Sequence, residues 1–225
     1  MRRSILLLGI ALVSLTLILA CGKPEEPAKK APKAAAKPQA TPAQKEAAKP
    51  EAPAQEEGQK ETSQLQKYDE PGMPIRAEYP DTMTLEGGCS GEGCGFTYNF
   101  KPRGNALDKA EVHIFLPVGA ASAAAQEPFV TGPNGLLHNN GWKKEGETTD
   151  TGKFPYEWVK KVISFSDPGN QGMEGKILLG ETHGQAVQVT LYYPADMAAE
   201  FLAQANLVLE NLQFKDDKLP LGRSI

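Results

Sequence analysis

The sequence predicts an α+β domain in which an antiparallel β-sheet of about five or six strands carries packed helices. Two observations support this fold class. Between residues 96 and 193, short stretches alternate apolar and polar residues and follow one another through turns, which is typical of antiparallel strands. Two further stretches have the composition or the spacing of helices, so we expect both kinds of element in one domain.

The expected strands are residues 96–100, 110–116, 142–150, 156–165, 175–182 and 185–193. The third of them is polar, which indicates an edge of the sheet. In the fourth, Val159, Ile163 and Phe165 occur at matching parity, so we expect them on one face. His183 and Gly184 form the turn of the clearest hairpin, between the last two strands.

Two helices accompany these strands. Residues 120–130 are rich in alanine and precede a turn at 132–135. Residues 195–212 place apolar side chains at helical spacing, and Pro194 suits the start of a helix. The apolar stripe of this second helix consists of Phe201, Ala205, Val208 and Leu212, widened by Leu202 and Leu209.

The first twenty residues resemble an export signal. Two arginines precede an apolar run that is too short to span a bilayer comfortably and that ends at Cys21. Residues 18–21, Ile-Leu-Ala-Cys, resemble the lipobox of bacterial lipoproteins. That resemblance implies cleavage before Cys21 and acylation of this residue, which anchors a chain to a membrane. With Gly22 next, it implies the outer membrane and a domain that faces the periplasm. A plain signal anchor is the alternative.

Composition divides the chain into four segments. After the signal at 1–20, residues 21–67 are mostly Ala, Pro, Lys, Glu and Gln, which predicts a disordered tether behind the lipidated cysteine. Residues 68–214 have the length of a single globular domain, and 215–225 form a polar tail. From residue 68 onward, thirteen Lys or Arg oppose twenty-one Asp or Glu. So acidic a domain argues against nucleic-acid binding, which needs positive charge to meet phosphates.

The order of the elements resembles that of PsbP-like domains. A strand at 95–100 is followed by an apolar strand that ends in Pro117, then a helix, then polar and apolar antiparallel strands. The close, from Tyr193-Pro-Ala-Asp-Met-Ala-Ala-Glu-Phe201 to Leu212-Gln-Phe214, looks like the final strand and helix of those domains. This resemblance, to a bacterial lipoprotein with a PsbP-like domain, implies an α/β/α sandwich and a non-catalytic, accessory role.

Cys89 and Cys94 are the other cysteines of the chain. In an exported protein, two cysteines this close most often form a disulfide, which here would stiffen a glycine-rich turn. A reducible disulfide that acts as a sensor is the alternative. The spacing fits neither a redox-active Cys-x-x-Cys pair nor a zinc site. The sequence therefore predicts no metal site and no cofactor.

Aromatic and polar side chains of the second half indicate a recognition surface. Trp and Tyr supply large contact areas with a polar group. The candidate surface residues are Trp142, Tyr156, Trp158, His138, Asn139 and Asn140. For the aromatic members, core packing beneath a helix is the alternative interpretation.

The sequence shows no motif of a catalytic site. Ser90 lacks the second glycine of a G-x-S-x-G turn, and no histidine stands at a spacing typical of a metal ligand. We therefore predict a membrane-anchored, non-enzymatic accessory or protein-interaction module of the cell envelope. Its expected partner is an envelope protein or a cell-wall component. A periplasmic module that binds a small ligand or a metal is the alternative.

Overall fold

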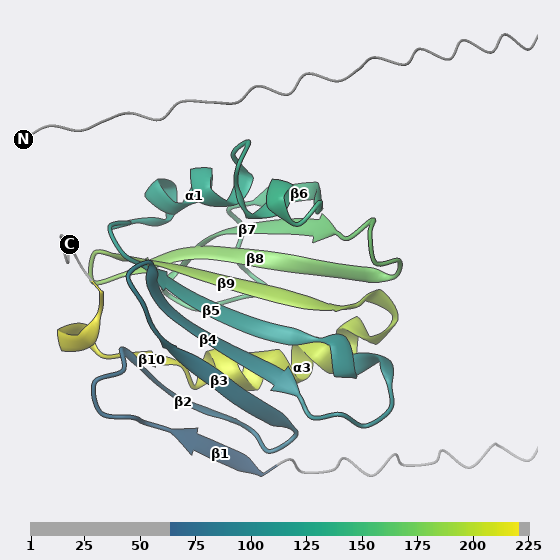
Figure 1. Ribbon diagram of the computed structural model, residues 1–225, viewed down its shortest axis with the longest axis horizontal. Helices are drawn as coiled ribbons and strands as arrows, with labels where there is room; N and C mark the ends of the chain where they lie inside the picture. Colours follow the sequence, from purple (N-terminus) through teal and green to yellow (C-terminus); the bar gives the residue numbers. More distant parts are fainter. Residues whose placement is uncertain (1–63, 221–225) are drawn as a thin grey trace, which may run out of the picture. The chain divides into compact units, whose positions relative to one another are not determined.

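The computed structural model describes residues 64–220, which contain two antiparallel sheets. The strands of the larger sheet are β3 (Met83–Cys89), β4 (Gly93–Phe100), β5 (Glu111–Pro117), β6 (Lys143–Thr148), β7 (Val159–Ser166), β8 (Met173–Thr182) and β9 (Gln185–Pro194). They lie in the order β3-β4-β5-β9-β8-β7-β6 (Figure 1). The smaller sheet has the order β1-β2-β10 and consists of β1 (Leu65–Tyr68), β2 (Ile75–Pro80) and β10 (Gln213–Phe214).

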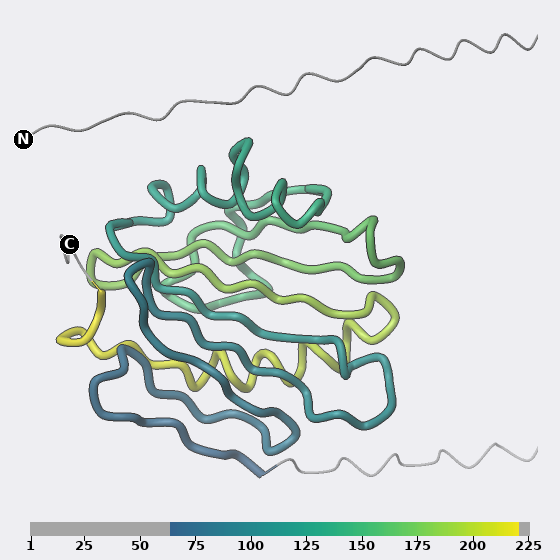
Figure 2. Tube along the Cα trace, in the orientation of Figure 1, coloured from purple at the N-terminus to yellow at the C-terminus, as the bar shows by residue number. Residues whose placement is uncertain are grey.

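Helices cover both faces of the larger sheet, so the described part of the chain is an α/β/α sandwich. Figure 2 shows the chain of α1 and α2 along one side of the sheet and that of α3 on the other. The helices are α1 (Ala123–Thr131), α2 (Leu136–Asn139) and α3 (Ala198–Glu210), with short 3₁₀ turns η1 (Ala106–Lys109), η2 (Ala195–Met197) and η3 (Asp216–Lys218). The α+β class expected from the sequence is confirmed.

The face toward α3 holds the main apolar core. Phe201 of α3 contacts Tyr193 of β9 and Phe100 of β4, with ring centroids 4.6 and 5.8 Å apart. The small sheet closes this core through Ile75 and Ala77 of β2. The buried residues that the central strands give to it are Phe96, Tyr98, Val112, Ile114, Leu116, Val187, Val189 and Leu191. These side chains alternate along each strand, as a sheet buried on this face requires.

The opposite face is covered over only half of its width. Ala123 and Val130 of α1 pack on Ile163, Ile177 and Leu179 of β7 and β8. On the same face of β3 and β4 the side chains are polar, and none of them is fully buried. The strand β5 lies at the border between the covered half and the open half, and this position creates the site described below.

Most of the expected elements are present, with shifted ends. The expected edge strand corresponds to β6, and the expected turn at His183 and Gly184 joins β8 to β9. The second expected helix corresponds to η2 followed by α3. The first helix begins at Ala123 rather than at residue 120, because the Ser122 side chain caps it by accepting a hydrogen bond from the amide of Ala125.

The structure contains more strands than the five or six expected. β3 extends the larger sheet to seven strands, and β1, β2 and β10 form the small sheet. β1 and β10 are short and β3 is glycine-rich, whereas β2 alternates apolar and polar residues and was not identified from the sequence. β1 begins at Leu65, inside the range assigned to the tether, and pairs with β2. Leu219 is buried within the range assigned to the polar tail. The signal, Cys21 and residues 22–63 lie outside the described residues. Within 64–220, no helix is long and apolar enough to cross a membrane.

A bulge in β7 overturns one expectation about parity. Val159 pairs with Gly180, but the next pair is Lys161 with Leu179, so residue 160 is an extra one. An extra residue reverses which side chains face each side of a sheet. Val159 therefore belongs to the core under α3, whereas Ile163 and Phe165 face α1.

An aromatic stack on the α1 face depends on a glycine. The ring of Trp142 stacks on Phe165 with centroids 4.2 Å apart, and on Tyr192 at 5.6 Å. Gly175 of β8 lies beneath the Phe165 ring, and a Cβ at this position would collide with that ring and with the carbonyl of Leu191. The absence of a side chain at Gly175 therefore leaves room for the Phe165 ring on which Trp142 stacks.

We expect Gly175→Ala to destabilise the domain by about 1–3 kcal/mol, as overpacking of a core does. Gly146→Ala on the edge strand is the matched control, because a Cβ there meets nothing within 4 Å. Thermal unfolding of both variants checks this, with a fall in Tm of roughly 2–4 °C per kcal/mol for a domain of this size. Equal Tm values for the two variants would contradict it.

Candidate functional site

A cavity of about 950 Å³ lies on the α1 face of the sheet. Its floor consists of side chains of β5 and β9, and one wall consists of α1, α2 and Trp142. Glu92 and the segment 117–120 close one end. Ligand pockets for small organic molecules commonly have volumes of about 300–1,000 Å³, so the cavity is large enough for such a molecule.

The floor is built from the side chains of two central strands that point away from the α3 core. β5 and β9 are antiparallel neighbours, in which His113 is opposite Thr190 and Phe115 is opposite Gln188. Glu111, at the start of β5, is opposite Tyr192. Because paired residues share a face, polar and aromatic groups alternate along the floor from Glu111 to Pro117.

The wall helix α1 is attached to the sheet by polar contacts. At its start, the Glu181 carboxylate of β8 accepts a hydrogen bond from the amide of Ala123, 3.2 Å away. One turn later, the buried amide of Gln126 donates to that of Gln188, with 2.9 Å between nitrogen and oxygen. Only Ala123, Gln126 and Val130 of α1 are fully buried, so these polar contacts fix the helix in place.

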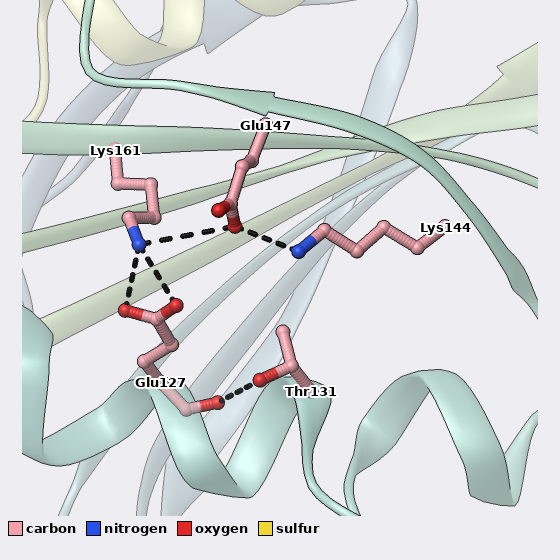
Figure 3. Close-up of polar contacts among 5 residues, drawn as sticks. All are labelled: Glu127, Thr131, Lys144, Glu147 and Lys161. Carbon is pink, nitrogen blue, oxygen red and sulfur yellow. Dashed lines mark hydrogen bonds and ion pairs between the residues drawn. The ribbon is translucent and has the colours of Figure 1, made fainter.

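An ion-pair network holds the outer side of α1 (Figure 3). The ammonium of Lys161 on β7 lies 2.8 Å from both carboxylate oxygens of Glu127 and 3.8 Å from Glu147 of β6. Lys144 binds the same Glu147 oxygen at 2.7 Å. The hydrogen bond with Glu127 raises the pKa of Lys161, and that with Lys144 lowers the pKa of Glu147. The network connects the cavity wall to two strands.

The closed end of the cavity is held by backbone contacts. Gln185 is fully buried and donates to the carbonyl of Pro117 at 2.7 Å, so it fixes the turn after β5. The amide of Val118 donates to the carbonyl of Glu92 at 2.9 Å. Glu92 lies in the loop between Cys89 and Cys94, which are joined by a disulfide, as expected from the sequence. The disulfide therefore supports one end of the cavity.

Thr190 is a floor residue whose buried hydroxyl lacks a hydrogen-bond partner within the described residues. Its side chain is 3% exposed. A buried hydroxyl without a partner lowers stability by about 1–3 kcal/mol. Thr190 lines the cavity, but its oxygen is not exposed to it, so the unsatisfied hydroxyl belongs to the protein interior.

Burial changes the acid–base behaviour of two floor residues. It lowers the pKa of His113 below its ordinary value of 6.5, so the imidazole is neutral near pH 7. It raises the pKa of Glu111, because a carboxylate loses hydration there. No Lys or Arg lines the cavity, whose ionisable residues are Glu92, Glu111 and His113.

The residues expected to form one recognition surface lie in different places in the structure. Trp142, Asn139 and Asn140 line the cavity. His138 does not; it borders a separate hollow that it shares with Trp142 and Lys144. α2 forms from the loop that carries these polar residues.

The other two aromatic residues of that surface lie on the opposite face. Tyr156 and Trp158 pack against the α3 core, and Tyr156 donates to the side-chain oxygen of Asn206 at 2.9 Å. Trp158 contacts Phe214 edge-to-face with centroids 6.1 Å apart. Both residues thus serve the core, as the alternative interpretation held.

Sequence reasoning missed most of the cavity. The residues it did not single out are Glu111, His113, Phe115, Gln126, Phe129, Gln188 and Thr190. A signal was present, since Glu111 and His113 alternate with apolar residues on β5, and Gln188 and Thr190 do so on β9. Polar positions on central strands indicate a face that no apolar layer fills.

The cavity combines groups that commonly hold a small organic molecule, since aromatic surface and amide groups line it together. Burial alone lowers the pKa of His113, without a contribution from a hydrogen bond or a neighbouring charge. Between residues 64 and 220, no group of three His, Cys, Asp or Glu side chains is placed to hold a metal ion.

Comparison with known proteins yields similar folds only. No protein-family model matches the sequence, and no curated protein matches it significantly. The crystal structure of the Saccharomyces cerevisiae Ran-binding protein Mog1p has a TM-score of 0.46 and 11% identity, over 70% of this chain and 99% of that one. The solution structure of a cyanobacterial PsbP from Synechocystis has a TM-score of 0.46 and 10% identity, over 73% and 100%.

A third similar structure, from Bacteroides thetaiotaomicron, has a TM-score of 0.39 and 17% identity, over 66% of this chain and 48% of that one. A cyanobacterial PsbP is thus among the structures that this chain partly resembles. The PsbP-like and the lipoprotein parts of the resemblance found in the sequence both stay predictions. TM-scores below 0.5 describe the course of the chain and say nothing of the cavity.

The buried imidazole predicts a dependence of stability on pH. Since the pKa of His113 is lower in the folded protein than in the unfolded chain, the unfolded chain binds a proton first as the pH falls. The stabilising effect of neutral His113 is complete above about pH 6.5 and is lost below it. We expect the Tm of wild type to fall further than that of His113→Gln between about pH 7.5 and pH 5. Parallel Tm curves would contradict this.

Proposed function

We propose that this chain is a lipid-anchored, non-catalytic module of the cell envelope whose cavity on the α1 face binds a small organic ligand. The observation that carries the proposal is the cavity of about 950 Å³, whose lining combines aromatic side chains, amide groups and two carboxylates. Pockets for small organic molecules commonly combine apolar and aromatic surface with a few polar groups.

The anchoring part of the proposal is supported by the sequence. Cys21 ends the apolar run of the export signal, and residues 22–63 supply a long Ala/Pro/Lys/Glu segment before the first described residue. Two or more acyl chains on Cys21 give effectively permanent attachment to a membrane. We place the module on the outer membrane, with the domain in the periplasm, because Gly22 follows the cysteine.

A protein partner in the envelope is the second candidate. Phe129 of α1 lines the cavity and is 68% exposed, which makes it a prominent exposed aromatic side chain of the described residues. Aromatic residues at the mouth of a cavity are frequent anchors of protein interfaces. We favour the small-ligand function, because a cavity of this volume with the amides of Gln126 and Gln188 in its lining fits a small molecule better than a protein surface.

The binding function predicts that the full chain retains a neutral aromatic alcohol, 2-(1-naphthyl)ethanol, in equilibrium dialysis. Ala125 lines the cavity from α1, so Ala125→Trp places a large ring in part of this space and should lower binding at least about tenfold. Ala124→Trp is the matched control, because Ala124 is an exposed neighbour outside the cavity. Binding that both variants retain in full would show that the alcohol binds elsewhere.

Thr190→Val tests whether the buried hydroxyl is unfavourable to folding. Because the hydroxyl has no partner within the described residues, its removal should leave the free energy of unfolding unchanged or raise it by about 1 kcal/mol. Thermal unfolding checks this. A large loss of stability would show that the hydroxyl contributes to folding.

The anchor predicts a covalent lipid on Cys21. Cells fed an alkyne-labelled palmitate should incorporate the label into the wild-type chain and into Cys94→Ala, but not into Cys21→Ala. Cys94 is a suitable control, since it lies in the disulfide of the described domain. Labelling that persists in Cys21→Ala would exclude the proposed site of lipidation.

A further inference from the structure

The charges of the cavity are all of one sign. Glu92 and Glu111 line it, whereas no Lys or Arg does. These carboxylates mark opposite ends of the floor: Glu111 starts β5, and Glu92 lies beside the turn after Pro117. At about 3.3 Å per residue, the strand between them spans roughly 20 Å. An anionic group would be repelled near Glu111, and no Lys or Arg lines the cavity to offset this repulsion.

Glu111 differs from an ordinary surface carboxylate. It is half-buried, and no described side chain forms an ion pair or a hydrogen bond with it. Charged groups that lose hydration normally gain a partner of opposite charge. Since the protein supplies none within residues 64–220, the partner is expected from the ligand.

An aromatic corner adjoins this carboxylate. Tyr192 is directly opposite Glu111 in the sheet and stacks on Trp142, with ring centroids 5.6 Å apart. Asp167 accepts a hydrogen bond from the Tyr192 hydroxyl at 2.6 Å, so a second carboxylate lies beside Tyr192. Burial and this hydrogen bond raise the pKa of Tyr192 to about 12. The Glu111 carboxylate thus lies next to a neutral aromatic pair.

Carboxylates beside aromatic rings favour one chemical class of ligand. An ammonium group is attracted to the face of Trp or Tyr and to a carboxylate at the same time, and both attractions strengthen when water is excluded. Farther along the floor, Phe115 provides apolar surface that suits the remainder of an amphipathic molecule.

We infer that the ligand of this cavity is an organic amine, with its ammonium group between the Glu111 carboxylate and the Trp142 ring and its apolar body along β5 toward Phe115. This inference rests on the function proposed above. It assigns Glu111 and Trp142 to recognition of the charge, and Phe115 to recognition of the apolar body.

The test compares three probes that share one aromatic ring system and differ in charge. They are 2-(1-naphthyl)ethylamine, 2-(1-naphthyl)ethanol and 1-naphthylacetate, each measured by equilibrium dialysis with the full chain and with Ala125→Trp as background. We expect the amine to bind about tenfold more tightly than the alcohol, and the acid to bind most weakly. This order of affinity supports the amine site.

Glu111→Gln provides the decisive variant, because it removes the charge and keeps the shape of the side chain. We expect it to bring the affinity for the amine down to that for the alcohol. Glu92→Gln is the matched control at the other end of the cavity and should preserve the order of affinities. Tm values of the two variants show that both are folded.

The outcomes distinguish this inference from the proposed function. If the alcohol binds and the amine binds no more tightly, the amine site is overturned while the small-ligand function stands. If the preference for the amine survives in Glu111→Gln, the ammonium lies elsewhere and the inference is also overturned. If none of the three probes binds in a way that Ala125→Trp abolishes, the proposed function itself fails.

Discussion

The pairing of β5 with β9 is the interaction on which the rest of the domain depends. These two strands lie at the centre of the sheet, and their faces are of opposite character. Val112, Ile114 and Leu116 face the core under α3, whereas Glu111 and His113 on the same strand face α1. The first face supplies the apolar burial that holds the sheet together. The second face can therefore remain polar, and it becomes the floor of a cavity.

The cavity persists because α1 is held at a distance from β5 by directional contacts. A helix with a broad apolar stripe would settle onto the sheet and fill the space. α1 instead is attached at Glu181, at Gln188 and at Lys161, which lie on β8, β9 and β7. Its neighbouring residues Ala125 and Phe129 then face the cavity. Hydrogen bonds and ion pairs set the width of the site, and the aromatic stack around Trp142 sets its far end.

Sequence periodicity predicted those elements that bury a complete apolar face. The hairpin of β8 and β9 and the helix α3 follow from the alternation before Tyr193 and from the stripe around Phe201 and Val208. β3 was not predicted, since its stability comes from pairing with β4 and from the disulfide rather than from a pattern of its own. The bulge in β7 could not be predicted either. It is defined by the pairing of β7 with β8, and the residues on either side of it still alternate in the sequence.

The candidate site was predicted only in part, because its residues come together through pairing across strands. Trp142, Asn139 and Asn140 were identified from their types and their loop, and they do line the cavity. Glu111 and His113 become part of a site only through the pairing of β5 with β9. Their partners, Tyr192 and Thr190, are about 80 residues away in the sequence and directly opposite in the sheet.

A half-buried carboxylate in the floor reduces the stability of the free domain, and this cost is itself an argument for a ligand. Glu111 loses part of its hydration, and no described side chain pairs with it. Groups that oppose folding cluster at sites where function requires them. Thr190 lies two residue pairs farther along the β5–β9 ladder, but its oxygen is not exposed to the cavity. The carboxylate of Glu111 is therefore the group that a ligand can reach, and a molecule that offers an ammonium group to this end of the floor relieves the cost of burying it.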